Sequence, residues 1–253
     1  MNMDFIYNID KEKPLDNMVS DGGFTGIFRT IGCVGDSLAS GEFESDNGNG
    51  GKGYHDFFDF SWGQYLARMC GSKAINFSRG GMTAIEYCQS FADSMGYWNP
   101  KLACDAYIIA LGCNDLGGRS MELGTANDID GEEKETFAYY YCKIIERYKA
   151  IQPRAKFFLV TFPKDRENDY VPKHRSLLYD IAAKYDNTYV IDIYRYGPVY
   201  DKAFKDKFFL LGHMNPMGYL FTAKMFASYI DYIIRHNMDD FKEVGYIGTD
   251  LHA

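Results

Sequence analysis

The sequence lacks a long apolar run and a secretory leader. Nowhere among its 253 residues is there a stretch of about 18 apolar residues, the length that a membrane-spanning helix needs. Its first ten residues are mixed and acidic, unlike the basic and then apolar pattern of a signal peptide. We therefore expect a cytoplasmic protein with no membrane partner, and leave secretion open in case a signal peptide has been trimmed.

Clustered metal ligands and paired cysteines are also missing. The six cysteines form no Cys-x-x-Cys pair, and most sit in apolar segments, which predicts buried free thiols rather than disulfides. There is no His-Glu-x-x-His, and the five histidines are scattered, so no metal is expected.

Positive charge is in deficit. The chain has 27 basic and 35 acidic residues, a formal net charge of −8. This balance argues against a general attraction to nucleic acid or to anionic membranes. It says little about a small-molecule substrate, and it leaves the oligomeric state open.

What the sequence does contain is a repeated alternation of apolar runs and helical segments. The runs are nearly all apolar, as in strands buried on both faces of a parallel sheet. They lie at 30–35, 74–78, 106–112, 156–162 and 188–193. Helical spacing occurs at 61–70, 137–150, 175–185 and 216–237. This order predicts one doubly wound α/β domain over residues 29–238, with an N-terminal extension (1–28) and a C-terminal tail (239–253) that docks on the body or on a second subunit.

Residues able to catalyse ester hydrolysis follow several of these runs. Ser37 comes directly after the first run, a glycine-rich turn (76–83) after the second, Asn114 after the third, and His213 just before the last helix. Ligands of open parallel sheets bind beyond the carboxyl ends of the strands. Ser37 would supply a nucleophile, His213 a base, and a glycine N–H with the Asn114 amide the donors for an oxyanion.

These segments resemble the four motif blocks of the SGNH (GDSL) hydrolase superfamily. The segment 35–38 (Gly-Asp-Ser-Leu) resembles the nucleophile block, and 76–83 (Asn-x-Ser-x-Gly-Gly-x-Thr) the second block. The segment 112–115 (Gly-x-Asn-Asp) resembles the third, and 213–219 (His-x-Asn-x-x-Gly-Tyr) most of the last. All four occur in family order.

The resemblance implies a role for each matching residue. Ser37 would be the nucleophile and His213 the general base, later the acid that protonates the leaving alcohol. The N–H groups of Ser37 and Gly81 and the side-chain amide of Asn114 would form the oxyanion hole, Gly81 being selected by the family spacing within 76–83. The implied fold is a flavodoxin-like three-layer α/β/α sandwich with a five-stranded parallel sheet of order 2-1-3-4-5, and no cofactor is implied.

One position departs from the family pattern. Members usually carry an Asp three residues before the histidine, where it orients the imidazole, but this chain has Leu210. A leucine cannot accept the Nδ1–H hydrogen bond. Three possibilities stay open: a backbone carbonyl or water holds the ring of His213, Asp206 or Asp192 reaches it from elsewhere, or activity is impaired.

Other features have alternative interpretations. The Gly-x-Gly-x-x-Gly at 48–53 follows a polar stretch rather than a strand, so it fails as a dinucleotide fingerprint and is expected to be a flexible loop. Within 41–60, aromatics from Tyr54 onward either form a lip beside the serine or pack the start of the next helix. Cys113 is expected to pack at a strand end rather than act as a nucleophile.

The resulting expectation is a serine esterase that forms an acyl-Ser37 intermediate. A small acyl group on a carbohydrate-like alcohol is favoured, because no long apolar groove or membrane element is visible. A lysophospholipase or thioesterase for longer chains is the same-class alternative. Leu210 keeps a third possibility, a catalytically impaired binding module with the same fold.

Overall fold

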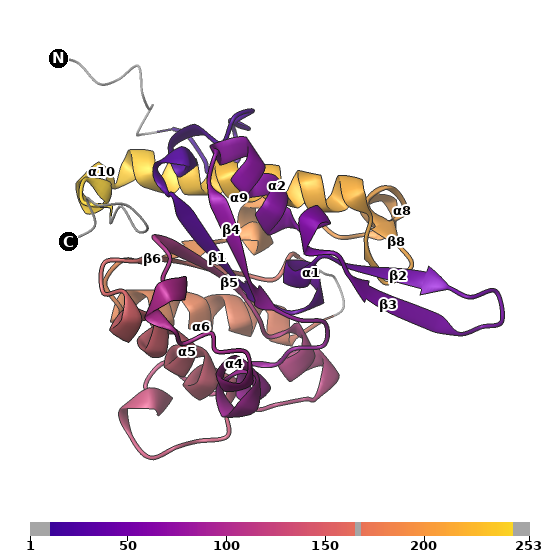
Figure 1. Ribbon diagram of the computed structural model, residues 1–253, viewed down its shortest axis with the longest axis horizontal. Coiled ribbons are helices and arrows are strands. Elements are labelled where there is room, and N and C mark those ends of the chain that lie inside the picture. The colour runs from indigo at the N-terminus through magenta and orange to yellow at the C-terminus, as the bar shows by residue number, and fades with distance from the viewer. Residues whose placement is uncertain (1–10, 165–167, 245–253) are drawn as a thin grey trace.

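The computed structural model describes residues 11–164 and 168–244. Its centre is a five-stranded, all-parallel sheet (Figure 1). The strands are β1 (Thr30–Gly35), β4 (Lys73–Ser78), β5 (Ala106–Ala110), β6 (Lys156–Val160) and β7 (Thr188–Ile191). Their spatial order is β4-β1-β5-β6-β7, which is the predicted 2-1-3-4-5 when these five strands are numbered along the chain.

Helices cover both faces of the sheet, which confirms the three-layer architecture (Figure 1). Strand residues alternate between two hydrophobic clusters, so that Ile108 of β5 packs toward one face and Ile109 toward the other. This two-sided burial explains why the strands are apolar throughout. The longer helices are α2 (Trp62–Cys70) and α9 (Pro216–His236) on one face, and α5 (Phe137–Ile151) and α6 (Tyr170–Lys184) on the other. The shorter ones are α1 (Ser37–Ser40), α3 (Ala84–Glu86), α4 (Ala92–Ser94), α7 (Ile193–Tyr196), α8 (Lys202–Phe208) and α10 (Met238–Phe241).

Helix α6 begins five residues before the predicted start, at Tyr170. Pro172 falls in its first turn, where the backbone N–H has no intrahelical acceptor in any case, so the proline is tolerated there. The other three long helices begin and end within one residue of the prediction.

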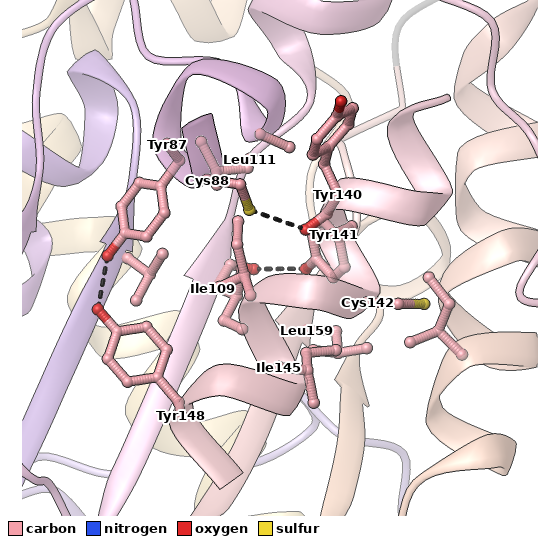
Figure 2. Packing of buried hydrophobic residues seen from close by; sticks show 14 of the residues in the cluster. Tyr87, Cys88, Ile109, Leu111, Tyr140, Tyr141, Cys142, Ile145, Tyr148 and Leu159 are labelled. Carbon is pink, nitrogen blue, oxygen red and sulfur yellow. Dashed lines mark hydrogen bonds between the residues drawn. The ribbon is translucent and has the colours of Figure 1, made fainter. Parts of the chain in front are cut away.

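The chain contains 21 tyrosines and 19 phenylalanines, and many of the tyrosines are buried (Figure 2). The hydroxyls of Tyr87 and Tyr148 are hydrogen-bonded to each other at 2.6 Å, and the Tyr141 hydroxyl donates to the carbonyl of Ile109 at 3.1 Å. These bonds matter because an unpaired hydroxyl in this core would lose the hydration that it has in the unfolded chain.

The segment 48–53, which was expected to be a flexible loop, forms the turn of a β-hairpin and the first two residues of its second strand. β2 (Glu42–Asp46) and β3 (Lys52–Asp56) pair in antiparallel register, and the hairpin projects from the body near α8 and β8 (Figure 1). Gly48 and Gly50 both have positive φ in its turn, which explains the glycine-rich composition. A second two-stranded ladder, β8 (Phe209–Leu210) with β9 (His213–Met214), lies beside it.

Both ends of the described chain pack on the body. Glu12 of the N-terminal extension pairs with Arg235 of α9 at 2.7 Å, and the Thr25 hydroxyl donates to the carbonyl of Ala227 at 2.9 Å. Phe241 of the tail is buried against Phe28. Val244 of the tail also packs against the core, whereas its other apolar residues, Tyr246 and Ile247, lie outside the described residues.

The cysteine prediction holds for four of six positions. All six thiols are free, and Cys33, Cys88, Cys104 and Cys142 are buried. Cys113 is exposed, contrary to its expected packing at a strand end. In the part of the chain that the structure describes, no helix is both long and apolar enough to cross a bilayer.

Candidate active site

Ser37 is the first residue of α1, directly beyond the carboxyl end of β1. The preceding Asp36 caps this short helix by accepting the N–H of Leu38 at 3.1 Å. Gly35 leaves no room for a side chain, since a Cβ there would meet Ala39 and the carbonyl of Ala110. Burial raises the pKa of Asp36 to about 7. The turn therefore holds Ser37 at the sheet edge, with Asp36 as its cap.

His213 lies on β9, next to α1. Its ring stands between two carboxylates: Nε2 is 2.9 Å from Oε1 of Glu42, and Nδ1 is 3.3 Å from Oε2 of Glu44. Among the described contacts there is no hydrogen bond between His213 and Ser37. The fold thus brings the two elements together, while the nitrogen that would serve Ser37 faces Glu42.

Glu44 is buried, with 3% of its surface exposed. Its Oε2 accepts the N–H of Gly212 at 2.8 Å, and Lys52 Nζ lies 2.5 Å from its Oε1. The hydrogen bond from Lys52 lowers the pKa of Glu44. Gly212 has no space for a Cβ, because Oε2 of Glu44 occupies that position. A buried, paired carboxylate is thereby fixed against the imidazole.

Glu42 contacts two of the predicted motif blocks. Besides His213, its carboxylate packs against Gly80, where a Cβ would collide with Oε2. The Tyr219 hydroxyl donates to its backbone carbonyl at 2.6 Å. Burial raises the pKa of Glu42, and the positive charge of a protonated His213 opposes that shift.

Neither glutamate was predicted as a site residue from the sequence. They are two residues apart on β2, and a period of two places side chains on the same face of a strand. If the segment had been predicted as a strand, this spacing would have placed both glutamates on the same face of it.

The alternative partners proposed for His213 are engaged elsewhere. Asp192 is fully buried, and it pairs with Arg175 at 2.7 Å and accepts the Tyr179 hydroxyl at 2.9 Å. Asp206 is exposed and pairs with Lys202 at 2.6 Å. Neither contacts His213 among the described residues, so the structure does not support this one of the three open possibilities.

The three expected oxyanion donors come from the first three motif blocks: Ser37, Gly81 and Asn114. Asn114 follows Gly112, whose φ of 124° and close packing on aromatic rings exclude a side chain. Asn114 Nδ2 donates one hydrogen bond to the carbonyl of Met82 at 3.0 Å, which leaves its second N–H available. Gly81 has φ 71°. The backbone N–H groups of Ser37 and Gly81 are unused in the hydrogen bonds of the described chain.

A cavity of about 180 Å³ lies beside the first, third and last blocks, and its lining includes none of Ser37, Gly81, Asn114 and His213. Its wall includes immediate neighbours of all three predicted catalytic side chains: Leu38 beside Ser37, Cys113 beside Asn114, and Met214 beside His213. The remaining lining is mostly apolar and comes from the ends of β5 and β6 and from α9.

Aromatic residues of the hairpin flank this site. The Tyr54 ring stands edge-on to that of His213, with centroids 5.8 Å apart, and Tyr54 is 56% exposed. Phe57 is also exposed and packs against Phe43. Tyr54 therefore lies beside the histidine, whereas Phe57 supports the base of the hairpin.

Comparison with known proteins shows the family and supports the fold. The model of the GDSL-like Lipase/Acylhydrolase family matches residues 33–220, and no curated protein matched the chain. The fold is similar to that of a family 3 carbohydrate esterase from Clostridium thermocellum (TM-score 0.55, 15% identity, 81% of this chain and 96% of that one). It is also similar to that of a possible lipase from Chitinophaga pinensis (TM-score 0.53, 17% identity, 81% and 98%).

A third similar structure is a family two carbohydrate esterase from Clostridium thermocellum in complex with cellohexaose (TM-score 0.54, 14% identity, 84% of this chain and 65% of that one). At these identities the structures support the fold, whereas the family model spans all four sequence motifs. The chain belongs to the GDSL-like lipase/acylhydrolase family and is an SGNH-type ester hydrolase.

Proposed function

We propose that this ester hydrolase acts through an acyl-serine intermediate on Ser37. The supporting observation is that the residues adjacent in sequence to Ser37, Asn114 and His213 line one cavity at the carboxyl edge of the sheet. That edge is where parallel α/β proteins bind ligands.

Each predicted site residue has a defined role in this reaction. His213 Nε2 takes the proton of the Ser37 hydroxyl as Oγ bonds to the acyl carbon. The N–H groups of Ser37 and Gly81 and the amide of Asn114 stabilise the resulting oxyanion. The ester C–O bond then breaks, and His213 returns the proton to the leaving alcohol. Water attacks the acyl-enzyme with His213 again as base, which releases the carboxylic acid and restores Ser37.

In the structure the carboxylate of Glu42 contacts Nε2 of His213, the nitrogen that would have to face Ser37. The mechanism therefore requires this contact to give way to Ser37 when substrate binds. Catalytic hydrogen bonds of unliganded enzymes often tighten only in the substrate complex.

The preferred substrate is a small acyl group on a carbohydrate-like alcohol. Tyr54 supports this choice, because an exposed aromatic ring next to His213 offers a flat apolar surface for a sugar. Carbohydrate esterases among the structural neighbours are consistent with it.

Labelling with a fluorophosphonate tests the nucleophile. We expect labelling and esterase activity in the wild type, and neither in Ser37→Ala. Loss of a catalytic serine in another hydrolase lowers kcat by about 10⁶-fold. A folded wild-type protein that is neither labelled nor active would contradict the proposal and would favour a binding module.

The cavity favours a second candidate, an esterase for medium-length acyl groups. An apolar protein cavity of about 150 Å³ holds a benzene molecule, so about 180 Å³ suits an acyl chain of roughly six carbons. Rates on p-nitrophenyl acetate, hexanoate and palmitate separate the candidates. If the cavity binds the acyl group, Ala110→Leu lowers the ratio of hexanoate to acetate rates at least tenfold. An unchanged ratio would remove this candidate.

A further inference from the structure

We propose that Glu44, delivered by the β2–β3 hairpin, positions His213 in place of the aspartate that Leu210 replaces. This inference rests on the proposed function of His213 as general base. It assigns to the hairpin a part of the active site that no motif block contains.

The geometry around the imidazole favours Glu44. Oε2 of Glu44 lies 3.3 Å from Nδ1 of His213 and 2.8 Å from the N–H of Gly212, so one carboxylate oxygen contacts both the ring and the backbone before it. Gly212 has no Cβ to block that approach. The contact defines both the orientation of the ring and the nitrogen that carries the proton.

The charge of Glu44 also suits this role. Lys52, across the hairpin, lies 2.5 Å from Oε1, and its hydrogen bond lowers the pKa of Glu44. An ionised carboxylate is an acceptor only, so it selects the tautomer with hydrogen on Nδ1. That tautomer leaves the lone pair of Nε2 for the Ser37 proton.

Glu42 is the other carboxylate at the imidazole ring. Glu42 contacts Nε2, the nitrogen that must face Ser37 during catalysis. Its contact has to break when His213 acts as a base, whereas the contact of Glu44 with Nδ1 can persist throughout. Only Glu44 is therefore placed as a positioning residue.

Two other polar residues of the hairpin, Tyr54 and Asp56, lie near His213 or Glu42. Tyr54 of β3 stands edge-on to the imidazole. Asp56 accepts a hydrogen bond from the Ser40 hydroxyl and interacts electrostatically with Glu42. The pH profile of each single-residue variant must therefore be compared with that of the wild type.

Glu44→Gln is the central test, with Asp46→Asn as its matched control. Asp46 lies two residues further along the same strand, is exposed, and caps the hairpin turn. A glutamine that keeps its oxygen on Lys52 places its NH₂ group where Oε2 was, so that it donates to Nδ1, favours the wrong tautomer and no longer accepts the N–H of Gly212. We expect kcat on p-nitrophenyl acetate to fall by about 10²–10⁴-fold with KM within threefold, by analogy with the corresponding change in a serine protease.

Two further readouts separate positioning from a merely structural role. The acid limb of the kcat/KM profile should move to lower pH in Glu44→Gln, because the imidazolium has lost an adjacent negative charge. The kcat of Glu44→Asp, which keeps the charge, should be at least tenfold higher than that of Glu44→Gln. Asp46→Asn should match the wild type in both measurements.

A measurement without turnover completes the test. The low-field proton resonance of a hydrogen-bonded Nδ1–H should be present in wild type and Asp46→Asn and absent in Glu44→Gln, with circular dichroism showing that each variant is folded. Wild-type kcat and resonance in Glu44→Gln would overturn the inference while leaving the proposed function intact. A wild type that is inactive and unlabelled by fluorophosphonate would instead contradict the proposed function, and the resonance would still report the Glu44 contact.

Discussion

Oε2 of Glu44 lies 3.3 Å from Nδ1 of His213, although the two residues are 169 positions apart in the chain. The contact joins a strand that follows the nucleophile turn to a strand that precedes the last helix. It explains how the chain can hold its histidine although Leu210 occupies the usual aspartate position, with half of its surface exposed.

Gly212→Ala should disturb this contact without changing either partner. A Cβ at position 212 would stand 2.5 Å from Oε2 of Glu44, so the carboxylate must move away from Nδ1. We expect kcat to fall at least tenfold and KM to change little. Gly131→Ala is the control, because a Cβ there meets nothing within 4 Å. Equal kcat values in the two variants would argue against a role for the Glu44 contact.

Leu210→Asp should partly restore a Glu44→Gln enzyme. Residues 210 and 213 are direct partners in the β8–β9 ladder, where side chains stand about 5 Å apart on one face. An aspartate there can reach the imidazole, as in the usual family pattern. We expect at least a tenfold recovery of kcat in the double variant. Absence of any recovery would show that position 210 cannot serve the ring in this fold.

Asn114→Ala should slow the chemical step. Removing a side-chain donor from an oxyanion hole lowers kcat by about 10²–10³-fold in another hydrolase. The same change removes the hydrogen bond to the Met82 carbonyl, so stability must be measured as well. A loss of kcat at constant KM in a folded protein supports the oxyanion role. If the variant only melts at a lower temperature, Asn114 is a structural residue.

Tyr54→Ala tests the lip beside His213. The Tyr54 ring contacts the imidazole edge-on and is largely exposed, so its removal should weaken binding of the alcohol part of the substrate. We expect a three- to tenfold higher KM for an acetylated sugar and a smaller change for p-nitrophenyl acetate. Equal changes for both substrates would count against a sugar platform.

Asp36→Asn should flatten the pH dependence of stability. Burial raises the pKa of Asp36 from 3.8 to about 7, so the native state keeps a proton that the unfolded chain releases. The free energy of unfolding therefore falls as pH rises from about 4 to 7, by up to about 4 kcal/mol from this group. Asparagine still accepts the N–H of Leu38 but does not titrate.

Denaturant unfolding at pH 4.5 and pH 7 measures this difference. Wild type should lose more stability across the interval than Asp36→Asn. Asp239→Asn, at a position with a 99% exposed side chain, is the control and should behave like wild type. A slope that is identical in Asp36→Asn and wild type would show that Asp36 titrates normally.

The local patterns of the sequence determined the sheet and the order of the motif blocks. A strand buried on both faces must be apolar along its whole length, and the turn after it needs residues such as Gly35 and Gly112, which allow close packing or positive φ. These requirements act over a few residues, so Ser37, Asn114 and His213 could be placed at one edge of the sheet from the sequence. The positions of the long helices followed from spacing for the same reason.

Only the tertiary structure decided which acid faces His213. The hairpin has few apolar residues, and its buried positions hold Glu42 and Glu44, the reverse of the usual pattern in a strand. These carboxylates are stable there because Lys52, Gly212 and His213 surround them, and two of these three lie far away in the chain. Such a contact depends on where the hairpin folds back onto the β8–β9 turn, and no local propensity specifies that position.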